Sequence, residues 1–269
     1  MTTIPTYETI LVDEPATAVR RITLNRPEKR NAISSQLRVD LFDALHAHDE
    51  DADVRVTIIR GAGPCFSSGY DLGSALWDDK PFWSSGGDGK WSRHVSDGWF
   101  GLWDLAKPVI AQVHGYALAG GTELMAACDL AYVAADAQIG YPVTRIISPP
   151  DMQFHPWLVG MRNAMELLLT GDSVSGEEAA RIGLCNRAYP PEALEASVLE
   201  VAEKIAKVET DLQQINKRSV HRAMDIMGVR AAIRAGSELQ ALAGHQKSVE
   251  ARLADALANM KGAVDKPAE

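Results

Sequence analysis

One segment constrains the fold of this chain more than any other. Residues 108–113 read PVIAQV, residues 115–124 read GYALAGGTEL, and an apolar stretch continues to residue 128. This order predicts a buried strand, a glycine-rich turn and a buried helix. A helix start leaves backbone N–H groups without intrahelical acceptors at the positive end of the helix dipole. Because glycine lets a ligand approach the backbone closely, the turn is a candidate anion site.

Glu123 falls in the first turn of this helix, which is apolar on all sides. An N–H group that stabilises an anion, placed beside a buried carboxyl, suits the formation and protonation of an enolate. A structural interpretation is also open. Glycines in a turn permit tight packing, and a first-turn glutamate stabilises a helix without chemistry. The segment by itself does not decide between the two.

Composition narrows the class of protein. The chain has 269 residues, of which 46% are hydrophobic, so it can form a large domain with a substantial core. Its net charge of −9 argues against nucleic acid as a partner. The cysteines, Cys65, Cys128 and Cys185, lie far apart and predict reduced core thiols. Without a signal peptide or a long apolar run, the sequence predicts a cytoplasmic protein with no membrane partner.

The first half of the chain alternates between strand and helix patterns. Residues 8–12 and 17–25 predict a hairpin that turns at residues 13–15, and a helix is expected after Ser34. The alternation continues to residue 140 and indicates the α/β class.

The C-terminal part has a different character. Residues 191–259 are rich in Ala, Leu, Glu, Lys and Arg with helical spacing. We therefore predict an α/β core over residues 1–190. A helical region over residues 191–269 would pack on the core or on another subunit.

Residues 74–104 hold five of the six tryptophans. Trp99 and Trp103 are four residues apart and predict core positions of one helix. The others flank a Gly/Ser-rich stretch and favour a loop that lines a pocket or an interface.

Asp151 follows two prolines and has two possible roles. It could cap the helix that follows, or it could take part in chemistry, with His155 four residues later as a less favoured dyad partner. His46 and His48 lie beside Asp49 but point apart on a helix, so no metal site is predicted.

Three segments together resemble the crotonase, or enoyl-CoA hydratase/isomerase, superfamily. Residues 25–32 (NRPEKRNA) are similar to its first conserved loop, and residues 65–72 (CFSSGYDL) to its Phe-x-x-Gly-x-Asp-Leu segment. The glycine-rich turn and its helix, through residue 130, are similar to a third landmark. The resemblance covers roughly residues 8–190 and implies a crotonase-like spiral of ββα units with a helical C-terminal trimerisation region. The implied assembly is a homotrimer or a homohexamer.

The resemblance implies an acyl-CoA thioester as substrate, with no metal and no prosthetic group, since coenzyme A is part of the substrate. By motif position, the N–H groups of Tyr70 and Gly120 would form an oxyanion hole for the thioester carbonyl. Glu123 matches the first catalytic glutamate of the hydratases. The implied coenzyme A contacts are Lys29 and Arg30 at the phosphates, with Ala32, Ser68, Asp71 and Leu72 along the adenine and pantetheine path.

One position departs from the family pattern. The second catalytic glutamate of the hydratases would follow Pro142, and this chain has Val143 there. Glu123 acting alone as base and acid makes addition of water to a 2-enoyl-CoA in lipid metabolism the first expectation. Asp151 lies where some isomerases and dehalogenases of the family carry a catalytic aspartate. Isomerisation or ring-acyl-CoA hydrolysis by Glu123 and Asp151 is therefore the second expectation, and acyl-CoA binding without catalysis is the third.

Overall fold

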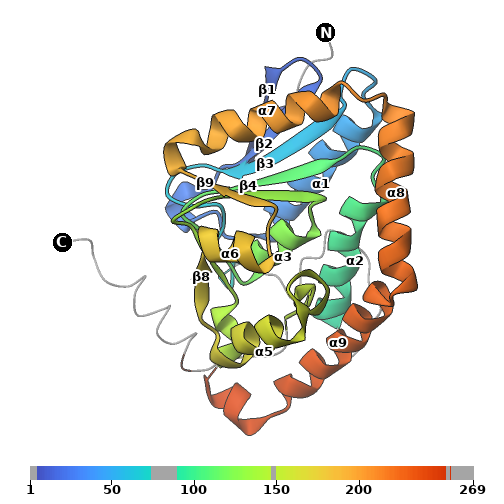
Figure 1. Cartoon of the computed structure of the whole chain (residues 1–269). Coiled ribbons are helices and arrows are strands. Elements are labelled where there is room, and N and C mark those ends of the chain that lie inside the picture. Colours follow the sequence, from blue (N-terminus) through green and yellow to red (C-terminus); the bar gives the residue numbers. More distant parts are fainter. Residues whose placement is uncertain (1–4, 74–89, 147–149, 253–254, 256–269) are drawn as a thin grey trace, which may run out of the picture.

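Two β-sheets form the centre of the molecule (Figure 1). The computed structural model describes residues 5–73, 90–146, 150–252 and 255. A six-stranded sheet has the strand order β1-β2-β3-β4-β6-β9. Its strands are β1 (Ile10–Ala16), β2 (Val19–Leu24), β3 (Val56–Gly61), β4 (Val109–Val113), β6 (Leu130–Ala134) and β9 (Arg187–Tyr189). A three-stranded sheet has the order β5-β7-β8, with β5 (Tyr116–Leu118), β7 (Gln138–Gly140) and β8 (Ser173–Ser175).

The hairpin of β1 and β2 is antiparallel, whereas the other neighbours in the larger sheet run parallel. The hairpin was expected, but its predicted turn at residues 13–15 is wrong. β1 extends to Ala16, and the turn includes Ala18, which has a φ of 61°. Pro15 is tolerated within β1 because this is an edge strand, where a missing N–H leaves no partner unpaired.

The chain passes repeatedly between the two sheets. β4 of the larger sheet leads to β5 of the smaller one and then to α3 (Gly120–Ala127). β6 and β7 repeat the path and lead to the short helices η2 (Pro142–Arg145) and α4 (His155–Leu158). The predicted α/β class and the spiral of ββα units are thereby confirmed.

Helices cover both faces of the larger sheet (Figure 1). Neighbouring strand residues point to opposite faces, so Ile58 packs toward α7 (Leu194–Ala206) and Ile59 packs into the main core. That core also receives side chains from α1 (Ser35–Glu50), α2 (Lys90–Asp104) and α3. As predicted, α1 follows an N-cap serine, since the Ser34 hydroxyl accepts from the Leu37 N–H. One sheet therefore supports α3 and the loops around its start.

The C-terminal region is helical, as expected. After α5 (Gly160–Thr170), α6 (Gly176–Ile182) and η3 (Pro191–Ala193), the chain forms α7, α8 (Thr210–Ile226) and α9 (Val229–Gly244). α8 and α9 run past α2 (Figure 1), and Lys217 of α8 donates to the Leu102 carbonyl at 2.8 Å. The boundary predicted at residue 190 falls between β9 and η3 and stays a prediction. Of the helices in the described ranges, none is both long and apolar enough to cross a bilayer.

Candidate active site

The start of α3 is held in a tight turn. Ala119 precedes the helix with φ 49° and ψ −120°, and its N–H donates to the Gly140 carbonyl at 3.0 Å. The Thr122 hydroxyl donates to the carbonyls of Ala117 and Gly140 at 2.7 and 2.8 Å. These bonds fix the first turn of α3 against β5 and β7. The N–H of Gly120, as the first residue of the helix, has no intrahelical acceptor.

The loop that carries Tyr70 lies against this turn. Gly69 has a φ of 102°, and a Cβ on it would lie 3.2 Å from the Gly120 nitrogen, so only glycine fits. A Cβ on Gly120 would lie 2.8 Å from Cε2 of the Tyr70 ring. The structure thus brings together the two residues whose N–H groups were predicted to form the oxyanion hole.

Glu123 is held by several donors. The residue is 1% exposed, and its carboxylate accepts from the hydroxyls of Tyr70 and Tyr141 and from the Met152 N–H at 3.3 Å. The Tyr70 hydroxyl in turn accepts from the indole N–H of Trp99 at 2.8 Å. The predicted acid/base group is therefore a buried, oriented carboxyl one turn from the Gly120 N–H.

The surroundings of Glu123 favour its protonated form. Burial, followed by the charge of Asp151, raises the pKa of Glu123 to about 8, against hydrogen bonds from Tyr70, Met152 and Tyr141 that lower it. A carboxyl that titrates near neutral pH can both accept and return a proton during turnover.

Asp151 is 3% exposed, and its charge acts on Glu123. The helix that follows, α4, begins at His155, and its N-cap residue is Phe154. The capping alternative for Asp151 is therefore wrong. The structure gives no support to the Asp151–His155 dyad through Nδ1, since that atom of the buried His155 has no hydrogen-bond partner in the described chain. Burial lowers the pKa of His155 to about 4, so this side chain is neutral at physiological pH.

Sequence reasoning missed Arg38 and Tyr141. Arg38 of α1 is fully buried, and its Cζ lies 5.6 Å from the centroid of the Trp99 ring. Burial lowers the pKa of Arg38, whereas electrostatic interactions with Tyr70, Asp151 and Glu123 raise it, so a guanidinium interacts with the two carboxyls. An arginine among the apolar positions of α1 was a usable signal. Tyr141 lies two residues before Val143, the position that the motif comparison singled out.

The predicted coenzyme A contacts lie on two adjoining loops. The Ile33 N–H donates to the Gly69 carbonyl at 2.8 Å, and the Ser68 N–H donates to the Arg30 carbonyl at 3.0 Å. These bonds hold the two loops side by side. The predicted contacts Lys29, Arg30 and Ala32 lie on the loop after β2, and Ser68, Asp71 and Leu72 lie on the loop after β3.

Some charged side chains on these loops are exposed to solvent, and others are paired with each other. Lys29 and Arg30 are exposed and could meet phosphates, and Leu72 is 46% exposed. Asp71 is paired with Arg26 at 2.8 Å, and Arg26 also donates to the Ala32 carbonyl at 2.6 Å. Asp71 therefore ties the two loops together.

The tryptophan predictions are met in part. Trp99 and Trp103 are core residues of α2, as expected. Trp77 and Trp83 lie outside the described residues, as does the side chain of Trp91, so the predicted pocket or interface role stays a prediction.

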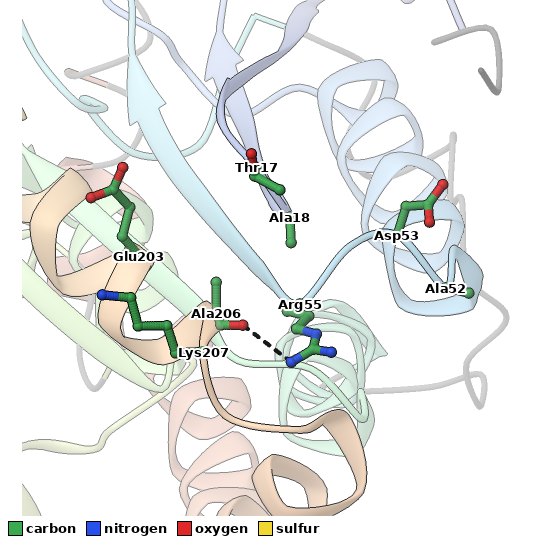
Figure 2. A pocket seen from close by; sticks show the side chains of 8 residues that line it. All are labelled: Thr17, Ala18, Ala52, Asp53, Arg55, Glu203, Ala206 and Lys207. Atoms are coloured by element: carbon green, nitrogen blue, oxygen red, sulfur yellow. Dashed lines mark hydrogen bonds between the residues drawn. The ribbon is translucent and has the colours of Figure 1, made fainter.

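A cavity of about 590 Å³ lies elsewhere, at the amino ends of β2 and β3 (Figure 2). The loops of the candidate site follow the carboxyl ends of the same strands. Arg55 in this cavity donates to the Ala206 carbonyl at 3.3 Å and pairs with Glu209 at 2.8 Å, so its charge is already engaged. In the described ranges no cluster of His, Cys, Asp or Glu side chains is placed to bind a metal ion. The cavity is lined by Thr17, Ala18, Ala52, Asp53, Arg55, Glu203, Ala206 and Lys207.

Known proteins match both the sequence and the fold. Residues 14–258 match the sequence profile of the family described as enoyl-CoA hydratase/isomerase. A Mycobacterium tuberculosis protein with the provisional name enoyl-CoA hydratase EchA13 is 37% identical over a 248-residue alignment. The alignment covers 84% of this chain and 76% of that protein.

Solved structures agree. The crystal structure of an enoyl-CoA hydratase from Mycobacterium smegmatis has a TM-score of 0.82 and 31% identity, covering 93% of this chain and 89% of that one. A structure described as a monofunctional enoyl-CoA isomerase from the same organism has a TM-score of 0.68 and 29% identity, covering 81% of this chain and 94% of that one. The chain therefore belongs to the enoyl-CoA hydratase/isomerase family, also called the crotonase superfamily.

Proposed function

We propose that this chain adds water to the double bond of a 2-enoyl-CoA thioester. The observation that carries the proposal is the buried carboxyl of Glu123, one helical turn from the N–H of Gly120 and bonded to the side chain of Tyr70. In this mechanism the N–H groups of Tyr70 and Gly120 bind the thioester oxygen. Each such donor contributes about 3–4 kcal/mol when it is aimed at the developing charge.

The proposed step moves one proton in each direction. The Glu123 carboxylate takes a proton from water as the water oxygen bonds to C3, and the electron pair of the double bond moves through C2 to the thioester oxygen. The Glu123 carboxylic acid then returns the proton to C2 as the enolate collapses. A pKa near neutrality suits both directions of transfer.

Double-bond isomerisation is the second candidate, and the proximity of Asp151 favours it. With two carboxyls that interact electrostatically, one could remove a proton from C2 of a 3-enoyl thioester while the other delivers a proton to C4. The family includes proteins described by either activity.

Coenzyme A enters this proposal as part of the substrate, and neither activity calls for a prosthetic group or a metal. The exposed Lys29 and Arg30 would meet its phosphates, supplying the local positive charge that an acidic protein needs for an anionic ligand.

We also propose that the chain forms a homotrimer or a homohexamer. Large apolar side chains are exposed along the C-terminal helices, and covering them with a second copy would remove this surface from water. Light scattering after size-exclusion chromatography measures the assembly, and a monomer would overturn this part of the proposal. The exposed side chains are Leu212, Ile215, Val220 and Ile226 of α8 and Leu239 and Leu242 of α9.

The ultraviolet absorbance of a conjugated enoyl thioester tests the activity. Wild type and Glu123→Gln would be compared on crotonyl-CoA, on a cyclic or aryl 2-enoyl-CoA and on a 3-enoyl-CoA. Loss of absorbance from a 2-enoyl substrate that depends on Glu123 supports hydration. A gain of absorbance from the 3-enoyl substrate supports isomerisation instead. Thioester binding without either change contradicts both and favours the binding-protein or hydrolase alternatives.

A further inference from the structure

Two tyrosine hydroxyls bond to Glu123 in a chain that has Val143 at the second glutamate position of the family pattern. The side chain of Val143 has no group that can hydrogen-bond to Glu123. Glu123 is instead bonded to Tyr70, on the loop that follows β3, and to Tyr141, which directly precedes η2. The two hydroxyl partners of Glu123 are therefore neutral donors from separate segments, beside the Met152 N–H.

The hydrogen bonds of Tyr70 have a defined direction. A phenol has one proton, and an indole N–H can only donate. The Tyr70 oxygen accepts from the Trp99 N–H at 2.8 Å, and the Tyr70 hydroxyl donates its one proton to Glu123 Oε2. The ring lies close to Gly120, where an added Cβ would come within 2.8–2.9 Å of three ring carbons.

We propose that the side chain of Tyr70 is a positioning residue, which orients the Glu123 carboxyl and favours its ionised form for proton transfer. The inference rests on the proposed function, and it gives Tyr70 a second role beside its backbone N–H. Tyr141 supports the same carboxyl, with its own oxygen accepting from the Asp151 backbone N–H. The Glu123 carboxyl is thus hydrogen-bonded to the hydroxyls of both tyrosines.

The charged and titratable groups around Glu123 define the expected pH effect. Asp151 raises the pKa of Glu123, and the bonds from Tyr70 and Tyr141 lower it. Arg38, on α1, adds a positive charge that interacts with Tyr70 and lies over the Trp99 ring. Removing the Tyr70 hydroxyl takes away one hydrogen bond that lowers the pKa of Glu123, while the effect of Asp151 remains. The pKa of Glu123 should therefore rise further.

Infrared titration of buried carboxyl groups tests this inference without substrate. The band missing from full-length Glu123→Gln identifies Glu123 in the wild-type protein. In Tyr70→Phe, which keeps the ring against Gly120, the midpoint of that band should move to higher pH by about one pH unit. Tyr7→Phe is the matched control, because the Tyr7 hydroxyl also donates to a carboxylate, that of Asp43, at an exposed site. It should leave the midpoint unchanged.

Steady-state kinetics supply the second readout. Tyr70→Phe should lower kcat at neutral pH about tenfold, leave KM nearly unchanged and shift the rising limb of the pH profile to higher pH. Trp99→Phe should shift the rising limb in the same direction by a smaller amount. It removes only the N–H that donates to the Tyr70 oxygen and leaves the Tyr70 hydroxyl in place.

Two outcomes would overturn the inference: an unmoved carboxyl midpoint in folded Tyr70→Phe, or a lower kcat with an unshifted pH profile. Absence of turnover by the wild type on both enoyl substrates would instead contradict the proposed function. The infrared titration would still decide whether Tyr70 controls Glu123.

Discussion

The helix α3 has a fully buried carboxyl in its first turn and a partly buried one just after its last turn, and the two have different surroundings. Glu123 lies in the first turn, among hydroxyl donors and opposite the carboxyl of Asp151. Asp129 follows the last turn and accepts from the Val109 N–H at 2.7 Å. It also contacts Lys217 at 2.9 Å and His221 at 3.2 Å, both on α8. The first carboxyl lies near another acid, whereas the second is paired directly with the Lys217 ammonium.

The difference suits Asp129 to a structural role and Glu123 to a chemical one. Lys217 also donates to the carbonyls of Leu102 and Lys107, so the Asp129 pair joins α8 to α2 and β4. A directly paired carboxylate of this kind fixes elements in place. Glu123 lacks such direct pairing in the described structure, and its raised pKa leaves it ready to exchange a proton.

The largest effect expected from this comparison is on turnover. Glu123→Gln should lower kcat about 1000-fold, the scale of a lost general acid/base, because the amide cannot exchange the proton. The melting temperature should stay the same or rise, since a poorly compensated buried carboxyl is removed. Turnover and thermal unfolding measured on the same preparation check both parts. Retention of activity would remove Glu123 from the mechanism.

At the other end of α3, stability should suffer instead. Asp129→Asn should lower the free energy of unfolding by about 3 kcal/mol, because it leaves the Lys217 ammonium buried without its partner. Urea denaturation measures this loss. Glu178→Gln is the control, since it removes an exposed ion pair with Arg181 and should change nothing measurable. A stable Asp129→Asn protein would mean that α8 is held mainly by apolar packing.

Glu123 should also make the stability of the chain depend on pH. The pKa of Glu123 is raised from 4.5 to about 8 in the folded chain, so between these values the folded state binds more protons than the unfolded state. Wild-type stability should therefore fall by a few kcal/mol relative to Glu123→Gln as the pH rises from 4.5 to 8. Denaturation of both proteins across this range gives the difference. Parallel curves would show that Glu123 ionises as easily folded as unfolded.

The smallest expected effect concerns Arg38, a buried cation that interacts with both Glu123 and Asp151. Arg38→Met removes a charge that favours the ionised carboxyls, so the rising limb of the pH–kcat profile should move to higher pH. Arg38→Lys, which keeps a positive charge, should restore much of the shift. Equal profiles for Met and Lys would indicate that Arg38 acts through packing on Trp99 and not through its charge.

Much of the fold was predictable because it depends on short-range patterns. The Ser34 cap, the apolar run of β4 and the glycines before α3 act within a few residues of themselves, so local sequence reports them. The turn between β1 and β2 was misplaced, since Pro15 also suits an edge strand and the sequence does not identify the edge. Asp151 was ambiguous because a cap depends on where the next helix begins, and α4 begins later than expected.

The sequence by itself determined the α/β class, the family resemblance and the places of Glu123, Tyr70 and Gly120 in recognisable motifs. Tertiary structure decided what surrounds Glu123. Tyr70 is 53 residues away along the chain and Met152 is 29 residues away, and α1 brings Arg38 to the same region. Local periodicity shows that a side chain is buried, but it does not show which distant side chain it meets. That depends on how strands from different parts of the chain pair, and on which loops then share one end of the sheet.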